Sequence, residues 1–307
     1  LKAFWLKLGS LHSIVVAPST SFFSSQSILT MGGDSAPAPR RSPEALAKIP
    51  WQVDAGVFLG CSVASALSVV PVVMAVDKSV TQAAAGMPLG QALKRVVIDM
   101  VKRPRAIAIP FGMVMGVYTL TYGANNLADV LGERYELGST TQNSLKLFGA
   151  TGAYTSSSIV KDVAFAKMFS KAAEGAAEVK RAVPMTTYGT FLFRDALIIG
   201  AGFILPAMVA GGFKSNGMEK ETADKVAQLA TPCAMQVVIT PIHLMGLNLY
   251  NTPVATTSER LKAVAKTCAE ATGVRMFRFF WAYGVGGLVN KSLNQRARQW
   301  TVERYAE

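Results

Sequence analysis

The sequence predicts an all-α integral membrane protein with six transmembrane helices in three repeats of about 85 residues and short surface helices in the odd-numbered loops. Three observations support this prediction: long stretches without charge, apolar runs that are continuous rather than alternating, and similar segments at equal spacing. Half of the 307 residues are hydrophobic and 16% are charged. Soluble domains carry roughly 25% charged residues.

Charged side chains are absent from four long segments, at 55–76, 106–128, 196–213 and 226–258, which contain 22, 23, 18 and 33 residues. A helix needs about 20 residues to cross about 30 Å of hydrocarbon, so three segments reach that length and the third in order nearly does. Transmembrane strands would instead alternate in polarity over about ten residues. The alternative is a large soluble protein with buried core helices.

Residues 1–50 are interpreted as a targeting segment followed by a flexible linker. Positions 1–30 contain no acidic residue, two lysines and seven serines, a composition typical of a mitochondrial transit peptide. In the alternative, Met31 is the initiator. Residues 34–43 are rich in Pro, Ala and Ser, which is typical of a linker. The membrane domain is expected at 51–298, followed by a polar C-terminal tail at 299–307.

Internal repetition organises the membrane domain. Pro71, Ser156 and Pro241 are 85 residues apart, and each lies late in an apolar segment that a basic stretch follows. Second apolar segments then begin near positions 105, 188 and 274. The third and sixth spans are weak, because charged residues bound them closely. Four or five spans therefore remain an alternative to six, although helices that line a wet cavity tolerate polar faces.

Basic residues predict the orientation of the chain. The three loops after the odd helices (77–104, 161–183 and 250–275) hold 14 Lys and Arg residues, whereas the two loops between repeats (129–146 and 212–225) hold five. This bias places the odd loops on the matrix side of a mitochondrial membrane, inner favoured over outer, in contact with anionic lipid headgroups. Apolar residues at helical spacing within 87–102 predict an amphipathic surface helix.

Three repeats of this size, each with two spans and a surface helix, make the chain resemble the mitochondrial carrier family. That family's signature is Pro-x-Asp/Glu-x-x-Lys/Arg at the end of each odd helix, where the proline kinks the helix and the charges close a cavity. Pro71 and Pro241 match the proline, and Lys161 matches the basic position after Ser156. The acidic positions hold Val73, Ser158 and His243, and the other basic positions hold Val76 and Gly246.

The resemblance implies transport of a small metabolite by alternating access, with Pro71, Ser156, Lys161 and Pro241 at the gate. The departures from the signature imply that the closing network of charges is incomplete. They favour either a carrier with an altered gate or, as the alternative function, a non-transporting scaffold or accessory subunit of a mitochondrial membrane complex.

Charged residues inside apolar segments are the candidate substrate-binding groups, because a charge at the bilayer centre costs at least about 2.5–3.5 kcal/mol. Arg194 and Asp195 interrupt the fourth segment, and Arg278 interrupts the sixth. Two inward arginines predict a small anionic solute, since guanidinium groups bind carboxylates well. His243 is expected as polar lining. The alternatives are snorkelling of Arg278 to the headgroups and local pairing of Arg194.

No enzyme motif is present in the sequence, and no cofactor or metal is predicted. The three cysteines and two histidines are too far apart in the sequence to suggest a disulfide framework or a metal centre. The net charge of +12 is not arranged as a basic stripe interleaved with aromatic residues, so nucleic acid is not expected as a partner.

Overall fold

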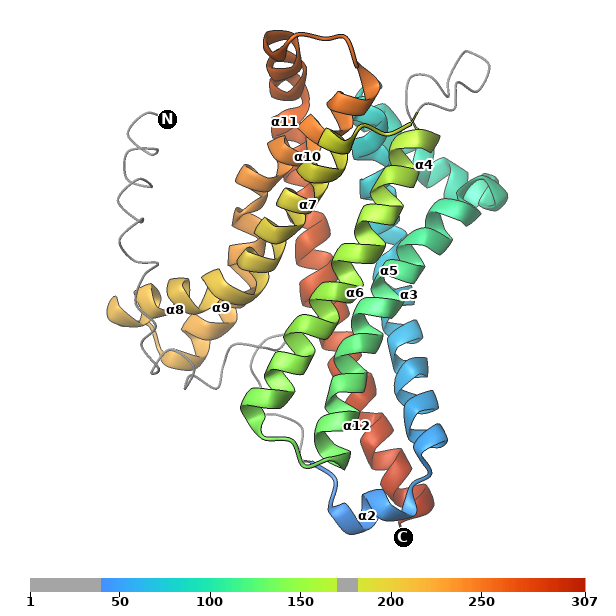
Figure 1. Ribbon diagram of the computed structural model, residues 1–307, viewed down its shortest axis with the longest axis vertical. Helices are drawn as coiled ribbons and strands as arrows, with labels where there is room; N and C mark the ends of the chain where they lie inside the picture. Colours follow the sequence, from blue (N-terminus) through green and yellow to red (C-terminus); the bar gives the residue numbers. More distant parts are fainter. Residues whose placement is uncertain (1–39, 170–181, 307) are drawn as a thin grey trace.

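The computed structural model describes residues 40–169 and 182–306, and the elements within these ranges are all helices (Figure 1). The first part of the chain forms α2 (Pro43–Lys48), α3 (Trp51–Ala84), α4 (Leu89–Lys102), α5 (Pro104–Arg134) and α6 (Ser139–Met168). The second part forms α7 (Met185–Ile199), η3 (Gly200–Ile204), α8 (Leu205–Ser215), α9 (Lys220–Ala234), α10 (Gln236–Asn251), α11 (Thr257–Phe279), η4 (Phe280–Val285) and α12 (Gly286–Tyr305).

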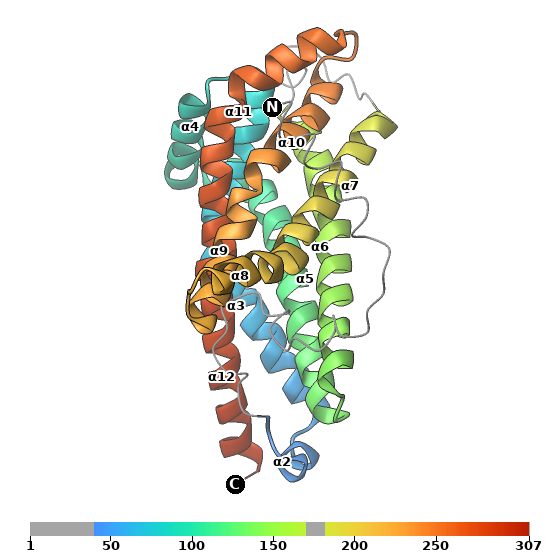
Figure 2. The same cartoon turned by 90° about the vertical axis from the view of Figure 1, so that its left-hand side faces the viewer.

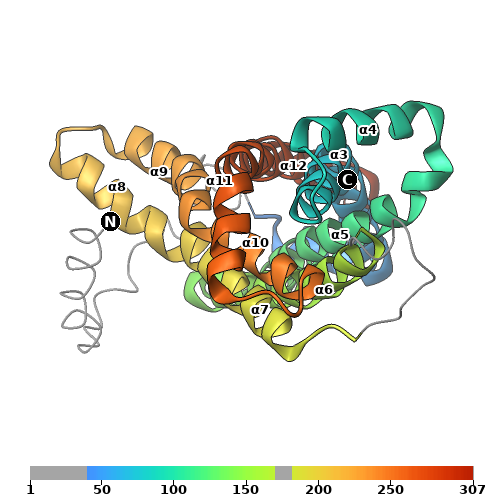
Figure 3. The ribbon, with the colours of Figure 1, turned by 90° about the horizontal axis from the view of Figure 1, so that it is seen from above.

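The long helices form a closed circuit. Helix α3 packs on α5, α5 on α6, α6 on α7, α7 on α10 and α10 on α11, while α11 and α12 return to α3. Viewed from above, these helices surround a common axis (Figure 3). The core lies where α3 and α5 meet, and includes Val69, Val70 and Val73 of α3 with Val114 and Val117 of α5.

Local sequence explains where several helices begin and end. Helix α2 starts with Ser42, whose hydroxyl accepts a hydrogen bond from the Ala45 N–H, and Pro43 occupies the first turn. After α3 and α8 the chain turns at Gly86 and Gly217, which have φ angles of 112° and 87°. These conformations are open to glycine and strained for other residues.

Helix α4 confirms the helix predicted within 87–102. It buries Leu89, Ala92 and Val96 on one side, while Val97 and Val101 are exposed. An exposed apolar edge on a short helix beside the bundle is typical of a helix at a membrane surface. Figure 1 shows α4 at the same end of the bundle as the start of α11.

The first half of the bundle is built of continuous helices and the second half of interrupted ones. Helix α3 passes through Pro71 without a break, and α10 likewise continues through Pro241. By contrast, the π-helical segments η3 and η4 interrupt α7–α8 and α11–α12, and α9 ends at Ala234, shortly after Pro232. Segments of π-helix often occur at functional sites. Figure 2 shows α8 and α9 as a pair to one side of α12.

Four helical stretches in the described ranges are long and apolar enough to cross a membrane: 51–84, 104–134, 185–215 and 220–251. They correspond to the first, second, fourth and fifth of the predicted spans. The third odd loop differs from the prediction, because a surface helix followed by a span was expected there and α11 runs without interruption from Thr257 to Phe279. A capping box between Thr256 and Glu259 starts this helix, and the segment contains no proline to end it early. Part of the second odd loop lies outside the described residues.

Candidate functional site

Six charged residues from four helices form a continuous chain of ion pairs, which we call the central network: Asp77, Lys161, Asp162, Arg194, Asp195 and Arg278. Lys161 Nζ on α6 lies 2.5 Å from Asp77 Oδ2 on α3 and 2.6 Å from Asp162 Oδ1. Arg278 Nε on α11 lies 2.7 Å from Asp77 Oδ1. Asp77 therefore joins α3 to both α6 and α11.

Arg194 on α7 continues the network. It pairs with Asp162 and with Asp195, whose Oδ1 lies 2.6 Å from Arg194 Nη2. Its Nη1 lies 2.8 Å from Nδ1 of His243 on α10. Arginine carries only donors, so Nδ1 accepts this hydrogen bond and the imidazole hydrogen is on Nε2. Helices α6, α7 and α10 thus meet at one guanidinium group.

Side chains of the central network are at most 7% exposed. Removing a charge from water costs several kcal/mol, and good pairing geometry is needed to offset that cost. Each member has an oppositely charged partner within 2.7 Å. The network therefore holds α3, α6, α7 and α11 together by charge, where apolar packing alone would have been the simpler solution.

The structure brings together all four predicted substrate-binding residues. Arg194, Asp195 and Arg278 are members of the central network, and His243 contacts it through Arg194. The predicted gate residue Lys161 is also a member. The other predicted gate residues do not take part: Pro71 and Pro241 lie within helices, and the Ser156 hydroxyl donates to Gly152 O of its own helix at 2.7 Å.

Sequence reasoning missed the acids that complete the network. It expected an incomplete set of charges because it compared Val73 and Ser158 with the acidic position of the carrier signature. Asp77 and Asp162 are themselves 85 residues apart, with the spacing of the repeat. That equal spacing is the signal that could have identified them. The third repeat has Leu247 at this position, so the network is not threefold.

A cavity of about 20 Å³ lies beside Arg278. Its lining is mostly aromatic and consists of Tyr118, Thr121, Tyr122, Tyr154, Arg278, Phe279, Ala282 and Tyr283. A water molecule needs roughly 10–15 Å³, so the cavity has room for water and is too small for an organic solute. Among the described residues, no group of three His, Cys, Asp or Glu side chains is placed to hold a metal ion.

A layer of neutral polar side chains joins α3, α5 and α12. Asn126 Nδ2 donates to Ser62 Oγ at 2.8 Å, and Asn290 Nδ2 donates to Asn126 Oδ1 at 2.9 Å. Asn294 Nδ2 donates to the same oxygen at 2.8 Å, while Ser65 Oγ donates to Asn290 Oδ1 at 3.1 Å. These amides fix the register of the three helices without any charge.

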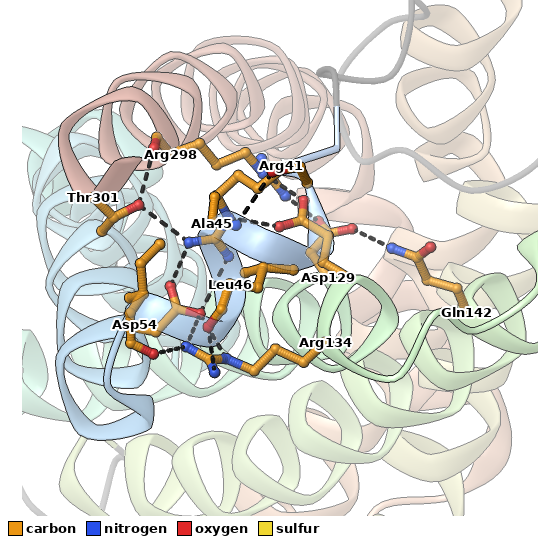
Figure 4. A network of polar contacts seen from close by, with 12 residues as sticks. Arg41, Ala45, Leu46, Asp54, Asp129, Arg134, Gln142, Arg298 and Thr301 are labelled. Atoms are coloured by element: carbon orange, nitrogen blue, oxygen red, sulfur yellow. Dashed lines mark hydrogen bonds and ion pairs between the residues drawn. The ribbon is translucent and has the colours of Figure 1, made fainter. Parts of the chain in front are cut away.

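A second group of charged residues lies at the other end of α3, and we call it the end network: Arg41, Asp54, Glu133, Arg134 and Arg298 (Figure 4). Arg41 lies at its centre, bidentate on Asp54 at 2.7 and 3.2 Å and 2.9 Å from Glu133. It also donates to Thr301 Oγ1 at 3.1 Å. A residue that precedes α2 thus binds α3, α5 and α12.

The acids of the end network each have a second cation. Arg134 Nη2 lies 2.8 Å from Asp54 Oδ2, and Arg298 Nε lies 2.7 Å from Glu133 Oε1. Toward the surface, Asp129 is bonded by Lys146 at 2.5 Å and by the Gln142 amide at 2.8 Å. The polar residues after 298 continue α12, so Thr301 belongs to a helix of the bundle.

Comparison with known proteins gives one family. A family model described as "Probable citrulline exporter" matches residues 61–298, which include the central network and most of the end network. No curated protein and no solved structure matches the chain. The match is to a different family from the mitochondrial carriers, so the resemblance to that family is corrected here. The layout of repeats was shared, whereas the carrier signature was largely absent.

Proposed function

The chain belongs to the family described as probable citrulline exporters, and on this premise we propose that it moves a small carboxylate-bearing solute across a membrane by alternating access. The solute class is that of the amino acid in the family description. The single observation that carries this proposal is the central network, because its ion pairs join helices that have no other polar link at that level.

Ion pairs suit a contact that must open. A seam of apolar side chains loses its full burial free energy when helices part into water. Paired charges lose each other and gain hydration, so the two states differ less in free energy. Lys161 is central to this exchange, because it bridges Asp77 and Asp162. We therefore assign the central network as the gate at one end of a transport path.

The end network is proposed as the gate at the opposite end. Asp54 and Asp77 are 23 residues apart on α3, or about 35 Å at 1.5 Å per residue. The hydrocarbon core of a bilayer is about 30 Å thick. The two networks would then lie toward opposite membrane faces, with the cavity beside Arg278 between them. Closure at both ends agrees with a cavity that holds no more than water.

We further propose that six helices span the membrane in three repeats. The four apolar stretches are joined in the circuit by α6 and by α11–α12, which have similar lengths and more polar residues. Many of those polar residues face inward: Lys161 and Asp162 of α6, and Arg278 and Asn290 of α11–α12, are buried. Polar residues that face a bundle interior are compatible with spanning helices.

The membrane is proposed to be the mitochondrial inner membrane, with anionic lipids around the basic end of the bundle. The acid-poor, serine-rich residues 1–30 support the organelle. Lys94, Lys102 and Arg103, in and just after α4, support contact with anionic headgroups. Cell fractionation followed by protease protection of the C-terminus would test both organelle and orientation. Recovery of the protein in another membrane would refute this assignment.

Transport is tested by exchange in liposomes. Protein reconstituted into vesicles that contain unlabelled citrulline is expected to take up labelled citrulline well above empty vesicles. The Lys161→Gln variant is expected to lose most of this uptake, because both carboxylates that it bridges lose a cation. Glu221→Gln, which removes an exposed ion pair with Lys225, serves as the matched control and should retain uptake.

No uptake of any amino acid or carboxylate by folded wild-type protein would refute the transport proposal. In that case, migration in native gels as a discrete complex far above the chain's 32.6 kDa would favour an accessory subunit. Melting curves of both variants separate loss of transport from loss of folding.

A further inference from the structure

One buried cation at the level of the central network has no carboxylate partner. The network contains three acids and three bases, so its own charges cancel. Arg275 lies one helical turn before Arg278 on α11 and is 3% exposed. Among the described residues, no carboxylate oxygen lies within 4.0 Å of it. It therefore adds one uncompensated positive charge to a buried region.

The surroundings of Arg275 differ from those of the other buried arginines. Its Nε donates a long hydrogen bond of 3.3 Å to Gln236 Oε1 on α10. Arg278 and Arg194, in contrast, each contact at least one carboxylate at 2.7 Å or less. An isolated buried charge costs far more than a paired one. A purely structural arginine at this position would be expected to have a carboxylate of the chain beside it.

Helix α10 presents a polar stripe on the side from which Gln236 meets Arg275. Gln236, Thr240 and His243 recur at intervals of four and three residues, so they lie on one helix face, and all three are buried. The Thr240 hydroxyl has no hydrogen-bond partner in the described part of the chain. A buried hydroxyl without a partner is rare and calls for an explanation.

We propose that Arg275 is the binding group for the carboxylate of the solute, with the Thr240 hydroxyl as a second donor, an inference that rests on the transport function proposed above. A carboxylate accepts two parallel N–H bonds from a guanidinium group and would cancel the excess charge. The same excess disfavours solutes with a net positive charge, because the three acids are occupied by Lys161, Arg194 and Arg278. The solute class is therefore a zwitterionic amino acid or an anion.

The cavity beside Arg278 indicates where the rest of the solute would lie. Arg278 is one turn from Arg275, and the cavity continues away from it along η4 toward Ala282 and Tyr283. At about 20 Å³ the cavity does not hold an organic solute, so binding requires α10 and α11 to separate from the tyrosine-bearing helices. Four tyrosine hydroxyls would then face the uncharged part of the solute.

The test measures melting in detergent with citrulline, with its carboxamide, and with chloride exchanged for gluconate. Citrulline is expected to raise the melting temperature of the wild type, and the carboxamide is not. The Arg275→Gln variant is expected to weaken citrulline binding by about tenfold or more, because a charge-assisted bond is lost. Without ligand this variant should melt at or above the wild-type temperature, since it removes an unpaired charge.

Arg278→Gln is the matched control, because it removes an arginine one turn away that is paired. It should lower the melting temperature without ligand, since Asp77 loses a partner. Citrulline binding to Arg275→Gln at wild-type affinity would overturn the inference, as would chloride giving the same stabilisation as citrulline. Wild-type protein that binds citrulline at Arg275 and does not exchange it in vesicles would instead refute the transport proposal alone.

Discussion

The two charged networks differ in which parts of the chain they join. All members of the central network lie on the long helices α3, α6, α7 and α11, and their side chains are at most 7% exposed. The end network centres on Arg41, which precedes the bundle, and its outer side chains reach 17% exposure at Arg134. One end is thus closed by the helices themselves and the other by an N-terminal residue inserted between them.

The networks also differ in redundancy. If Arg41 is removed, Asp54 keeps Arg134 and Glu133 keeps Arg298. If Asp77 is removed, Lys161 keeps Asp162, whereas Arg278 loses its ion pair. Since an uncompensated buried charge is costly, the central network should fail when a single acid is lost, and the end network should weaken gradually.

The largest effect is expected for Asp77→Asn. It leaves Arg278 buried without a carboxylate, beside the unpaired Arg275, and should reduce the free energy of unfolding by about 3–5 kcal/mol. Thermal melting in detergent measures this loss. The double variant Asp77→Asn/Arg278→Gln should recover part of it, because it removes the orphaned charge. A single variant that melts like the wild type would show that the network contributes little to holding the helices together.

A smaller effect is expected for Arg41→Gln, about 1–3 kcal/mol, because both of its acids retain a cation. Hydrogen exchange should show faster opening at the ends of α3, α5 and α12, with little change around Lys161. A loss as large as that of Asp77→Asn would contradict the redundancy described above. Thr301→Val, which removes only the hydroxyl partner of Arg41, provides a mild control.

Packing between the two networks is tested at Gly286, where α12 crosses α3 and α5. A Cβ there would lie 2.2 Å from Tyr122 Oη and 2.6 Å from Val69 Cγ1. Gly286→Ala should destabilise the protein by about 1–3 kcal/mol through overpacking. Gly273→Ala is the matched control, because a Cβ at that position meets no atom within 4 Å. Equal melting temperatures for the two variants would mean that α12 shifts freely between the networks.

The smallest effect concerns Glu259, an exposed carboxylate that contrasts with the buried ones. The backbone N–H and hydroxyl of Thr256 donate to it and lower the pKa of Glu259. Its contribution is therefore present above the ordinary pKa of glutamate and is lost as the pH falls through the lowered value. Glu259→Gln should fray the start of α11 and leave the melting temperature nearly unchanged. A drop of several degrees would be inconsistent with an exposed cap.

Much of the helical layout could be predicted from the sequence. The charge-free segments correspond to the four stretches that are apolar enough to span a membrane, and the helical spacing within 87–102 corresponds to α4. The site was predicted in part. Arg194, Asp195 and Arg278 stood out because they interrupt apolar runs, whereas Asp77 and Asp162 border basic loops and looked like ordinary loop charges.

What the sequence alone determined is the helical character of the chain and its apolar stretches, because backbone groups in hydrocarbon must bond within their own segment. Only the tertiary structure decided which charges meet. Arg41 and Glu133 are 92 residues apart, and Asp77 and Arg278 are 201 apart, so no local pattern links them. Ion pairs of this kind depend on side chains a few ångströms apart in space, and that proximity arises only when the helices close into a circuit.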